Sequence, residues 1–419
     1  MDHEALEREV TGLAEAARKA AQALAKAPGP LKNKALWAMA DRLVSAEGEI
    51  LAANGDDVKA ARRAGLSEAL LDRLTLNPAR LAGVVQSLRE VAALPDPVGE
   101  IEHLVRRPNG LQVGRMRVPL GVVGMVYEAR PNVTAEAAGL CLKAGNACIL
   151  RGGSEAHRSN TVIAGLLQEA LAEAGLPREA VQLVPTTDRA AVTILGRLDR
   201  LVDVIIARGG ESLMAGLAGA TVPLFRHGRG VCHVYVDEDA DLAQAEAIAV
   251  NAKCSRPGVC NALETLLVHA AVAPVFLPRI AQKLQAAGVE LRGCPESRRL
   301  VPEMGEATEE DWAAEYLALT LAVRVVPSFE AALEHIAQYG SGHSEAIVTR
   351  EYGKALRFLR EVDASCVLVN ASTRFNDGGE LGLGAEIGIS TQKLHARGPM
   401  GVRELTTTKF VVLGEGQVR

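Results

Sequence analysis

Aromatic side chains are scarce in this chain of 419 residues, at 3% of the total, and no basic run interrupts its mixed charges. A protein that binds single-stranded nucleic acid needs stacking platforms and a basic groove, so both absences argue against such a partner. No apolar run approaches the roughly 20 residues of a membrane span, and the N-terminal stretch is a helix of mixed charge rather than a signal peptide. The formal net charge is −5. We therefore expect a cytoplasmic protein without a nucleic-acid or membrane partner.

The cysteines form neither a disulfide framework nor a metal motif. There are seven of them, an odd number, and no pair has the Cys-x-x-Cys spacing with histidines at a matching interval. These features favour reduced thiols and no bound metal. Most free cysteines are small buried hydrophobes, so only the surrounding sequence can single out a reactive one.

Cys260 has such a context. It ends a short loop, Ser255-Arg256-Pro257-Gly258-Val259, that leads into an apolar strand expected over Leu263–Val268. A thiol on a rigid turn at the mouth of a strand can meet a substrate, and the cations Lys253 and Arg256 before it favour the thiolate. The sequence therefore predicts a cysteine nucleophile that forms a thioester.

The pattern of the chain changes twice. About a hundred helical residues are followed by a hairpin, Glu102–Arg107 and Leu111–Val118, that turns at Pro108-Asn109-Gly110. From Pro119 onwards short apolar strands alternate with helices, which is typical of doubly wound parallel sheets. The last strand, expected over Glu404–Leu413, is an edge that needs a partner, and this favours a homodimer or a higher homo-oligomer.

These patterns predict an α/β protein with two doubly wound parallel-sheet domains and a small β arm. We assign residues 1–104 and 119–226 to a cofactor-binding domain, and 364–388 is a candidate segment that returns to it. Residues 227–363 form the catalytic domain. The hairpin 105–118 and the C-terminal segment 389–419 form the arm for oligomerisation.

Two glycine loops suit a dinucleotide at the carboxyl ends of the first set of strands, where such sheets bind ligands. They are Arg151-Gly152-Gly153-Ser154-Glu155 and Arg208-Gly209-Gly210-Glu211-Ser212. The second places a glycine pair at a helix start, where free N–H groups attract phosphate. Neither is a G-x-G-x-x-G fingerprint or a P-loop, and glycine pairs also occur in plain turns.

Six segments together carry a resemblance to a known family. They are Pro119–Gly124, Tyr127–Thr134, Leu142–Ala147, Ile149–Ala156, Arg256–Asn261, and Asp311-Trp312 with Glu315-Tyr316. In these segments, and nearly from end to end, the chain resembles the aldehyde dehydrogenase superfamily and, within it, the reductases that act on gamma-glutamyl phosphate.

The resemblance implies that NADPH reduces L-glutamyl 5-phosphate to L-glutamate 5-semialdehyde and phosphate, the second step of proline biosynthesis from glutamate. The Cys260 thiolate displaces phosphate, and hydride converts the thioester into a thiohemiacetal that collapses to the aldehyde. The Asn132 side chain and the backbone N–H of Cys260 are the candidate donors to the oxyanion. The alternative for Asn132 is a helix cap before Thr134–Ala144.

The resemblance also assigns binding roles. Arg151 and Ser154, with Glu155 in the same loop, lie where the family binds the adenosine ribose, and a cation there suits the 2′-phosphate of NADPH. Glu315 corresponds to the glutamate that holds the nicotinamide ribose, although a surface carboxylate is the alternative. The glycine loop at the pyrophosphate comprises Gly209, Gly210, Glu211 and Ser212. The candidates for the substrate phosphate and carboxylate are Arg256, Lys253, Arg130 and Arg374.

One expected residue is missing. Hydrolytic aldehyde dehydrogenases have a glutamate base upstream of the cysteine, whereas the corresponding stretch here, Gly228–His233, has no carboxylate. His233 is a candidate base, but a histidine in a strand is more often structural. Other readings are another aldehyde dehydrogenase or acyl reductase of the same fold, or a non-catalytic oligomeric binding protein. The glutamate 5-kinase that makes the acyl phosphate is a candidate partner.

Overall fold

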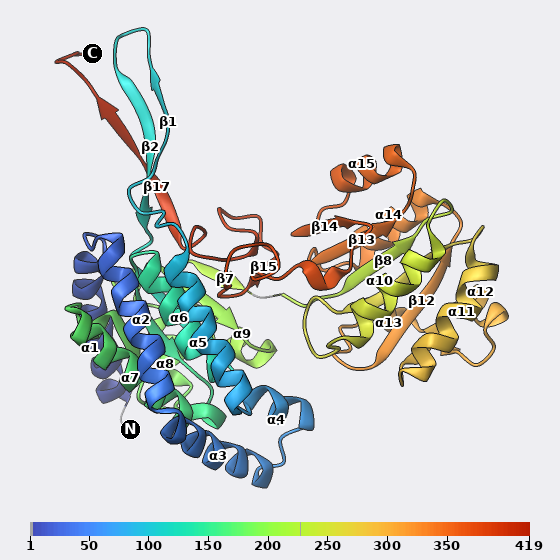
Figure 1. Cartoon of the computed structure of the whole chain (residues 1–419), viewed down its shortest axis with the longest axis horizontal. Coiled ribbons are helices and arrows are strands. Elements are labelled where there is room, and N and C mark those ends of the chain that lie inside the picture. Colours follow the sequence, from blue (N-terminus) through green and yellow to red (C-terminus); the bar gives the residue numbers. More distant parts are fainter. Residues whose placement is uncertain (1–2, 227) are drawn as a thin grey trace.

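The fold has three parts, two α/β domains and a narrow β arm that projects away from both (Figure 1). The structure, a computed structural model, describes residues 3–226 and 228–419, without the side chains of Ala69, Glu211 and Ser212. The expected boundary at residue 227 therefore falls outside the described residues. Within these residues, none of the helices combines the length and the apolar character that a membrane span requires.

A layer of helices opens the first domain. Their starts follow local sequence, since Asn77 caps α5 by accepting the Arg80 N–H, and Pro78 stands in the first turn, where a missing N–H costs nothing. The same tolerance lets α2 begin at Gly29, before Pro30. The helices are α1 His3–Leu24, α2 Gly29–Ser45, α3 Glu47–Arg63, α4 Glu68–Leu74 and α5 Pro78–Ala93.

The sheet of the first domain is parallel, with strand order β5-β4-β3-β6-β7. The chain runs from β3 to β4 and β5 on one side and then continues with β6 on the other side of β3. The switch point of the fold therefore lies between β3 and β6. The elements are β3 Val122–Tyr127, α6 Asn132–Lys143, β4 Ala147–Arg151, η1 Ser154–Ala156, α7 His157–Ala174, η2 Arg178–Ala180, β5 Val181–Leu183, α8 Ala190–Leu195, β6 Val204–Arg208, α9 Glu211–Gly216 and β7 Leu224–Arg226.

The second domain has a parallel sheet of order β11-β10-β12-β9-β8-β13-β14. Its strands are β8 Cys232–Val236, β9 Leu263–His269, β10 Glu290–Gly293, β11 Gly305–Glu306, β12 Thr320–Val326, β13 Ser344–Val348 and β14 Cys366–Val369. Its helices are α10 Leu242–Cys254, α11 Ala273–Ala286, α12 Pro295–Leu300, α13 Glu309–Trp312, α14 Phe329–Tyr339, α15 Tyr352–Glu361 and the single turn η3 Thr373–Phe375.

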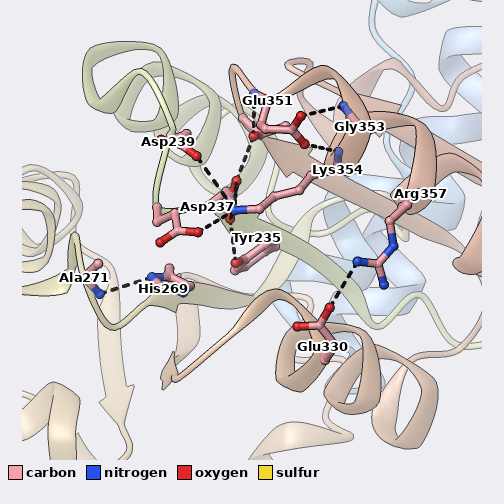
Figure 2. Close-up of polar contacts among 12 residues, drawn as sticks. Tyr235, Asp237, Asp239, His269, Ala271, Glu330, Glu351, Gly353, Lys354 and Arg357 are labelled. Atoms are coloured by element: carbon pink, nitrogen blue, oxygen red, sulfur yellow. Dashed lines mark hydrogen bonds and ion pairs between the residues drawn. The ribbon is translucent and has the colours of Figure 1, made fainter.

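An ionic cluster fixes α15 to the carboxyl end of β8 (Figure 2). The Lys354 ammonium lies 3.1 Å from Asp237 and 2.7 Å from Glu238, and Asp237 also accepts the Tyr235 hydroxyl at 2.9 Å. Cys260 precedes β9 and therefore lies at the opposite, amino end of this parallel sheet. The cluster in Figure 2 thus stabilises the end of the domain that is remote from the cysteine.

The arm is a three-stranded sheet of order β1-β2-β17. The hairpin of β1 Ile101–Arg106 and β2 Gln112–Pro119 is antiparallel, and β17 Thr406–Leu413 pairs antiparallel with β2 over eight residues. The C-terminal strand thus covers the free edge of β2 and leaves its own outer edge open. A separate two-stranded pair, β15 Ile389–Ser390 and β16 Gly398–Pro399, precedes it.

We expected the segment 364–388 to return to the first domain, but only part of it does. Its strand β14 pairs parallel with β13 and completes the second sheet, because this apolar strand extends an otherwise open edge. Only the later part crosses over: Ile387 belongs to the core of the first domain, and Gly384 approaches Leu94. The catalytic domain therefore extends beyond Asp363.

Candidate active site

Cys260 lines a cleft of about 450 Å³ at the junction of the two domains. The carboxyl ends of β3 and β6 form one wall, so the cleft opens at the switch point of the first sheet, the ligand site of such folds. The loop before β9 and the loop around Glu315 form the other wall. The lining includes Arg73, Glu128, Arg130, Arg208, Gly209 and Gly210 from the first domain, and Gly258, Cys260, Glu315 and Leu317 from the second.

Contacts from three directions hold the cysteine loop. The Cys232 thiol donates to the carbonyl oxygen of Cys260 at 3.1 Å from beneath. Arg73 reaches across from α4 and donates to the carbonyl oxygen of Gly258 at 2.9 Å. Gly230 packs so closely that a Cβ at its position would overlap the Cys260 carbonyl group. The thiol is therefore partly buried on a backbone that both domains restrain.

Lys253 does not reach the cleft. Its ammonium lies 2.6 Å from the Glu264 carboxylate, and both side chains are fully buried. Burial lowers the pKa of Lys253, although Glu264 opposes this shift. Burial raises the pKa of Glu264 to about 7 in spite of the neighbouring ammonium. Glu264 also accepts the Leu317 N–H at 3.2 Å, so the pair joins α10 to the loop that carries Glu315.

The three arginines expected at the substrate have different surroundings. Arg130 lines the cleft, where burial lowers its pKa and the neighbouring Cys260 opposes this shift. Arg374 is anchored beside the cysteine loop, where it donates to the Asn261 side chain and, at 3.3 Å, to the Ser255 hydroxyl. Arg256 is exposed and is not among the lining residues, but it lies close enough to affect the pKa of both other arginines.

Asn132 is the first residue of α6 rather than its cap, so the capping alternative is wrong. Pro131 occupies the cap position, and no side chain caps this helix end. The Asn132 amide instead donates to the Glu136 carboxylate at 3.0 Å. Burial raises the pKa of Glu136, while the amide favours its charged form. The contact fixes which end of the amide faces Glu136.

The loop of Arg151, Ser154 and Glu155 lies at the end of β4. Arg151 is buried and donates to the carbonyl oxygens of Gly152 at 3.0 Å and Thr187 at 2.9 Å. Burial lowers its pKa, and Glu155 partly reverses this effect. Ser154 is exposed, whereas the Glu155 carboxylate accepts the backbone N–H of Ala129. Neither Arg151 nor Ser154 lines the cleft, and the Arg151 guanidinium is turned to backbone carbonyl groups of the first domain.

Of the glycine pair after β6, only Gly210 leaves open space at the cleft, because a Cβ at Gly209 would overlap the Glu128 carboxylate and Leu213. Nothing lies within 4 Å of the place that a Cβ of Gly210 would occupy, and its N–H donates to the Glu128 carboxylate at 3.0 Å. Helix α9 has only six residues, so the N–H groups matter more here than a helix dipole. The side chains of Glu211 and Ser212 lie outside the described part. The space beside Gly210 lies at the switch point, where such folds bind a dinucleotide, and Glu128 occupies its N–H.

Glu315 lines the cleft and accepts the Gly230 N–H at 2.8 Å. Its loop is anchored by Asp311, whose carboxylate accepts the Tyr316 hydroxyl at 2.7 Å and the Arg292 guanidinium at 2.8 Å. His233, the alternative base, is fully buried, and its Nδ1 lies 2.8 Å from Glu345. That imidazole belongs to the interior of the domain rather than to the cleft.

Sequence reasoning missed five charged residues of the cleft wall: Arg73, Glu128, Arg208, Arg226 and Arg229. Glu128 follows β3 and Arg208 ends β6, so their position at the carboxyl ends of strands was a usable signal. Arg73 had no such signal, because it lies on a short helix 185 residues away from the glycine that it contacts.

Comparison with known proteins supports this picture. Residues 3–296 match the model of the aldehyde dehydrogenase family, whose members use a nicotinamide cofactor. Gamma-glutamyl phosphate reductases of Salinibacter ruber and Meiothermus ruber are each 59% identical, over 98% of this chain and 94% and 99% of theirs. The crystal structure of the gamma-glutamyl phosphate reductase of Thermotoga maritima is 48% identical, with a TM-score of 0.94 over 98% of this chain and all of that one. These matches confirm the expected fold. The chain therefore belongs to the aldehyde dehydrogenase family, as an oxidoreductase of its gamma-glutamyl phosphate reductase branch.

Proposed function

We propose that the protein reduces L-glutamyl 5-phosphate with NADPH to L-glutamate 5-semialdehyde and phosphate, the second step of proline biosynthesis from glutamate. The observation that carries this proposal is the cleft itself. It combines a restrained thiol, open space beside Gly210 at the switch point and several arginines, and its lining carboxylates are Glu128 and Glu315. Reductases named for this substrate match nearly the whole chain.

Cys260 is the nucleophile. Its sulfur forms a bond to the acyl carbon, the bond from that carbon to the phosphate oxygen breaks, and phosphate leaves with the electron pair. The Asn132 amide and the backbone N–H of Cys260 stabilise the oxyanion of this step. Glu136 fixes the amide through its hydrogen bond, which leaves the second amide hydrogen for the oxyanion.

The cofactor supplies the hydride that reduces the thioester. Gly209 and Gly210 would hold its pyrophosphate, and Glu315, on the cleft wall that also carries Cys260, would hold the nicotinamide ribose. Arg151 and Ser154 would hold the adenosine ribose, where a cation beside a small side chain favours the 2′-phosphate of NADPH. Glu155 belongs to the same loop, and its carboxylate accepts a hydrogen bond from the backbone N–H of Ala129.

Water must be kept from the thioester. The two lining carboxylates are both engaged with backbone N–H groups, Glu128 with Gly210 and Glu315 with Gly230. The buried His233 is turned to Glu345. None of these three groups is placed as a base for water beside Cys260, which suits release of the product by reduction rather than by hydrolysis.

The reverse reaction tests the proposal, because the acyl phosphate is labile. The protein is mixed with glutamate 5-semialdehyde and NADP⁺, with and without inorganic phosphate, and NADPH formation is compared with a Cys260→Ala variant. We expect turnover that requires phosphate and disappears in the variant. Turnover without phosphate would show that water resolves the thioester. Silence from the folded protein under both conditions would favour another substrate or a non-catalytic role.

A further inference from the structure

Five arginines line the cleft that holds Cys260: Arg226 and Arg229 near the crossover between the domains, and three more from separate elements. Arg73 lies on α4, Arg130 on the loop after β3 and Arg208 at the end of β6, and all three line the cleft. They belong to the helical layer and to the two strands at the switch point, so only the folded domain brings them together. This is a concentration of positive charge in a protein whose formal net charge is −5.

Arg130 is at the centre of this group. Burial lowers the pKa of Arg130, and repulsion from Arg208 and then from Arg73 lowers it further, whereas Cys260 acts in the opposite direction. Arg130 therefore interacts both with the other guanidinium groups and with the thiol. Because all three arginines line the same cleft as Cys260, they form a cationic centre beside the thiol.

Few carboxylates balance the charge of these three arginines. Among the described residues, neither Arg130 nor Arg208 forms an ion pair with a carboxylate. Glu136 and Glu386 interact with Arg208 at longer range; burial raises the pKa of both, whereas Arg208 acts in the opposite direction. Arginines held together without a full counterion raise the free energy of the folded state. An anionic ligand would remove this cost.

We propose that Arg130 and Arg208, with Arg73 on a third side, form the subsite for the phosphoryl group of the acyl phosphate, and for inorganic phosphate when the reaction runs backwards. This inference rests on the proposed function for the identity of the anion. Phosphate carries up to two charges and three terminal oxygens, which match two guanidinium forks. The α-carboxylate of the substrate has a single charge and needs only one partner.

The subsite also has a chemical role in the first step. When the bond between the acyl carbon and oxygen breaks, negative charge accumulates on the phosphate, and fixed guanidinium groups stabilise that charge. Arg73 also connects the subsite to the cysteine loop, because it donates a hydrogen bond to the Gly258 carbonyl oxygen. Phosphate binding and the position of the thiol are therefore coupled.

Protection of the thiol measures this subsite without turnover. Cys260 is alkylated with iodoacetamide at increasing concentrations of inorganic phosphate, and the modified peptide is quantified by mass spectrometry, which separates it from the other six cysteines. We expect phosphate to slow alkylation of the wild-type protein. The concentration for half protection should rise at least tenfold in Arg130→Gln and Arg208→Gln. Arg130→Lys keeps the charge without the guanidinium fork, so its half-protection concentration should lie between those of the Gln variants and that of the wild type.

Arg357→Gln is the matched control. It removes one arginine charge from α15, where Arg357 pairs with Glu330 at 3.1 Å on the part of the domain shown in Figure 2. Its half-protection concentration should equal that of the wild type. If phosphate gives no protection to the wild-type protein, or protects all variants equally, the subsite is refuted.

Kinetics of the reverse reaction separate this inference from the proposed function. In Arg130→Lys and Arg208→Lys, the KM for phosphate should rise at least fivefold, while the KM values for the semialdehyde and NADP⁺ change less than twofold. A rise confined to the semialdehyde would assign the arginines to the carboxylate, and one confined to NADP⁺ would assign them to the cofactor. Protection without any turnover would retain the subsite and reject the proposed substrate.

Discussion

The Glu128 carboxylate accepts the backbone N–H of Gly210 at 3.0 Å, across the switch point between β3 and β6. In our proposal this N–H lies at the diphosphate of the cofactor. A carboxylate there both occupies the donor and repels the incoming anion. We expect Glu128→Gln to tighten NADPH binding about fivefold, since removal of about 1 kcal/mol of repulsion changes the equilibrium by that factor.

A titration of NADPH fluorescence measures this dissociation constant without turnover. Glu179→Gln is the control, because it removes an exposed carboxylate of the same domain. Weaker binding in Glu128→Gln would instead show that this carboxylate holds a hydroxyl group of the cofactor.

Gly230 sets the position of the nucleophile. A Cβ at this residue would overlap the carbonyl group of Cys260, so Gly230→Ala must displace the cysteine loop. A displacement of about 1 Å can cost a factor of about 100 in rate. We therefore expect kcat/KM to fall about a hundredfold while the protein remains folded, as followed by circular dichroism and the phosphate-dependent assay.

Gly165→Ala provides the comparison. This glycine lies within α7, and nothing stands within 4 Å of the added Cβ. The same substitution should there leave activity unchanged and stabilise the helix by about 0.5–1 kcal/mol. Equal activity of the two variants would contradict the close packing of Gly230 against the cysteine loop.

Local patterns predicted much of this molecule. Asn109-Gly110 marked the hairpin, and the alternation of strands and helices marked the two sheets. The loop around Cys260 was visible because its residues are contiguous. By contrast, Lys253 is close to Cys260 in sequence but faces Glu264 on β9, and a helix face cannot be assigned without knowing which strand it covers. Arg73 reaches the same loop from α4 through the tertiary fold alone.

The buried pair of Lys253 and Glu264 gives Lys253 a structural role. Lys253→Met leaves a carboxylate buried without its partner, which typically costs about 3–5 kcal/mol. We expect a marked fall in the urea midpoint of the second domain. The double variant Lys253→Met/Glu264→Leu removes both charges and should recover much of the loss. A rise in the KM of the substrate with unchanged stability would instead support the original assignment of Lys253 to substrate binding.

The β arm indicates that the protein forms a homo-oligomer. Phe410, Val412 and Leu413 on β17 are more than half exposed, and the outer edge of this strand has no partner among the described residues. We propose that a second copy of the chain covers them in a homodimer or higher homo-oligomer. Deletion of residues 405–419 should reduce the mass measured by light scattering to that of a smaller species. An unchanged oligomer would refute the role of this strand.

Asp311 anchors the loop of Glu315 and should make it sensitive to acid. Burial acts to raise the pKa of Asp311, but hydrogen bonds from the Thr308 backbone, Tyr316 and Arg292 outweigh it and lower the value to about 2. A depressed pKa contributes stability that is present above the unfolded value near pH 4 and is lost as the pH falls through about 2. Asp311→Asn should therefore lose about 1–2 kcal/mol at pH 7 and depend less on pH between about 4 and 2.

The fluorescence of Trp312, beside Asp311 and only 6% exposed, reports this unfolding, since the other tryptophan, Trp37, is 46% exposed. Glu334→Gln, an exposed carboxylate on α14, is the control and should keep the wild-type acid response. If Asp311→Asn and the wild type lose stability in parallel below pH 4, the anchor is not the titrating group. If instead only Asp311→Asn is insensitive to acid and binds NADPH more weakly, the carboxylate that fixes this loop also fixes Glu315 for the cofactor.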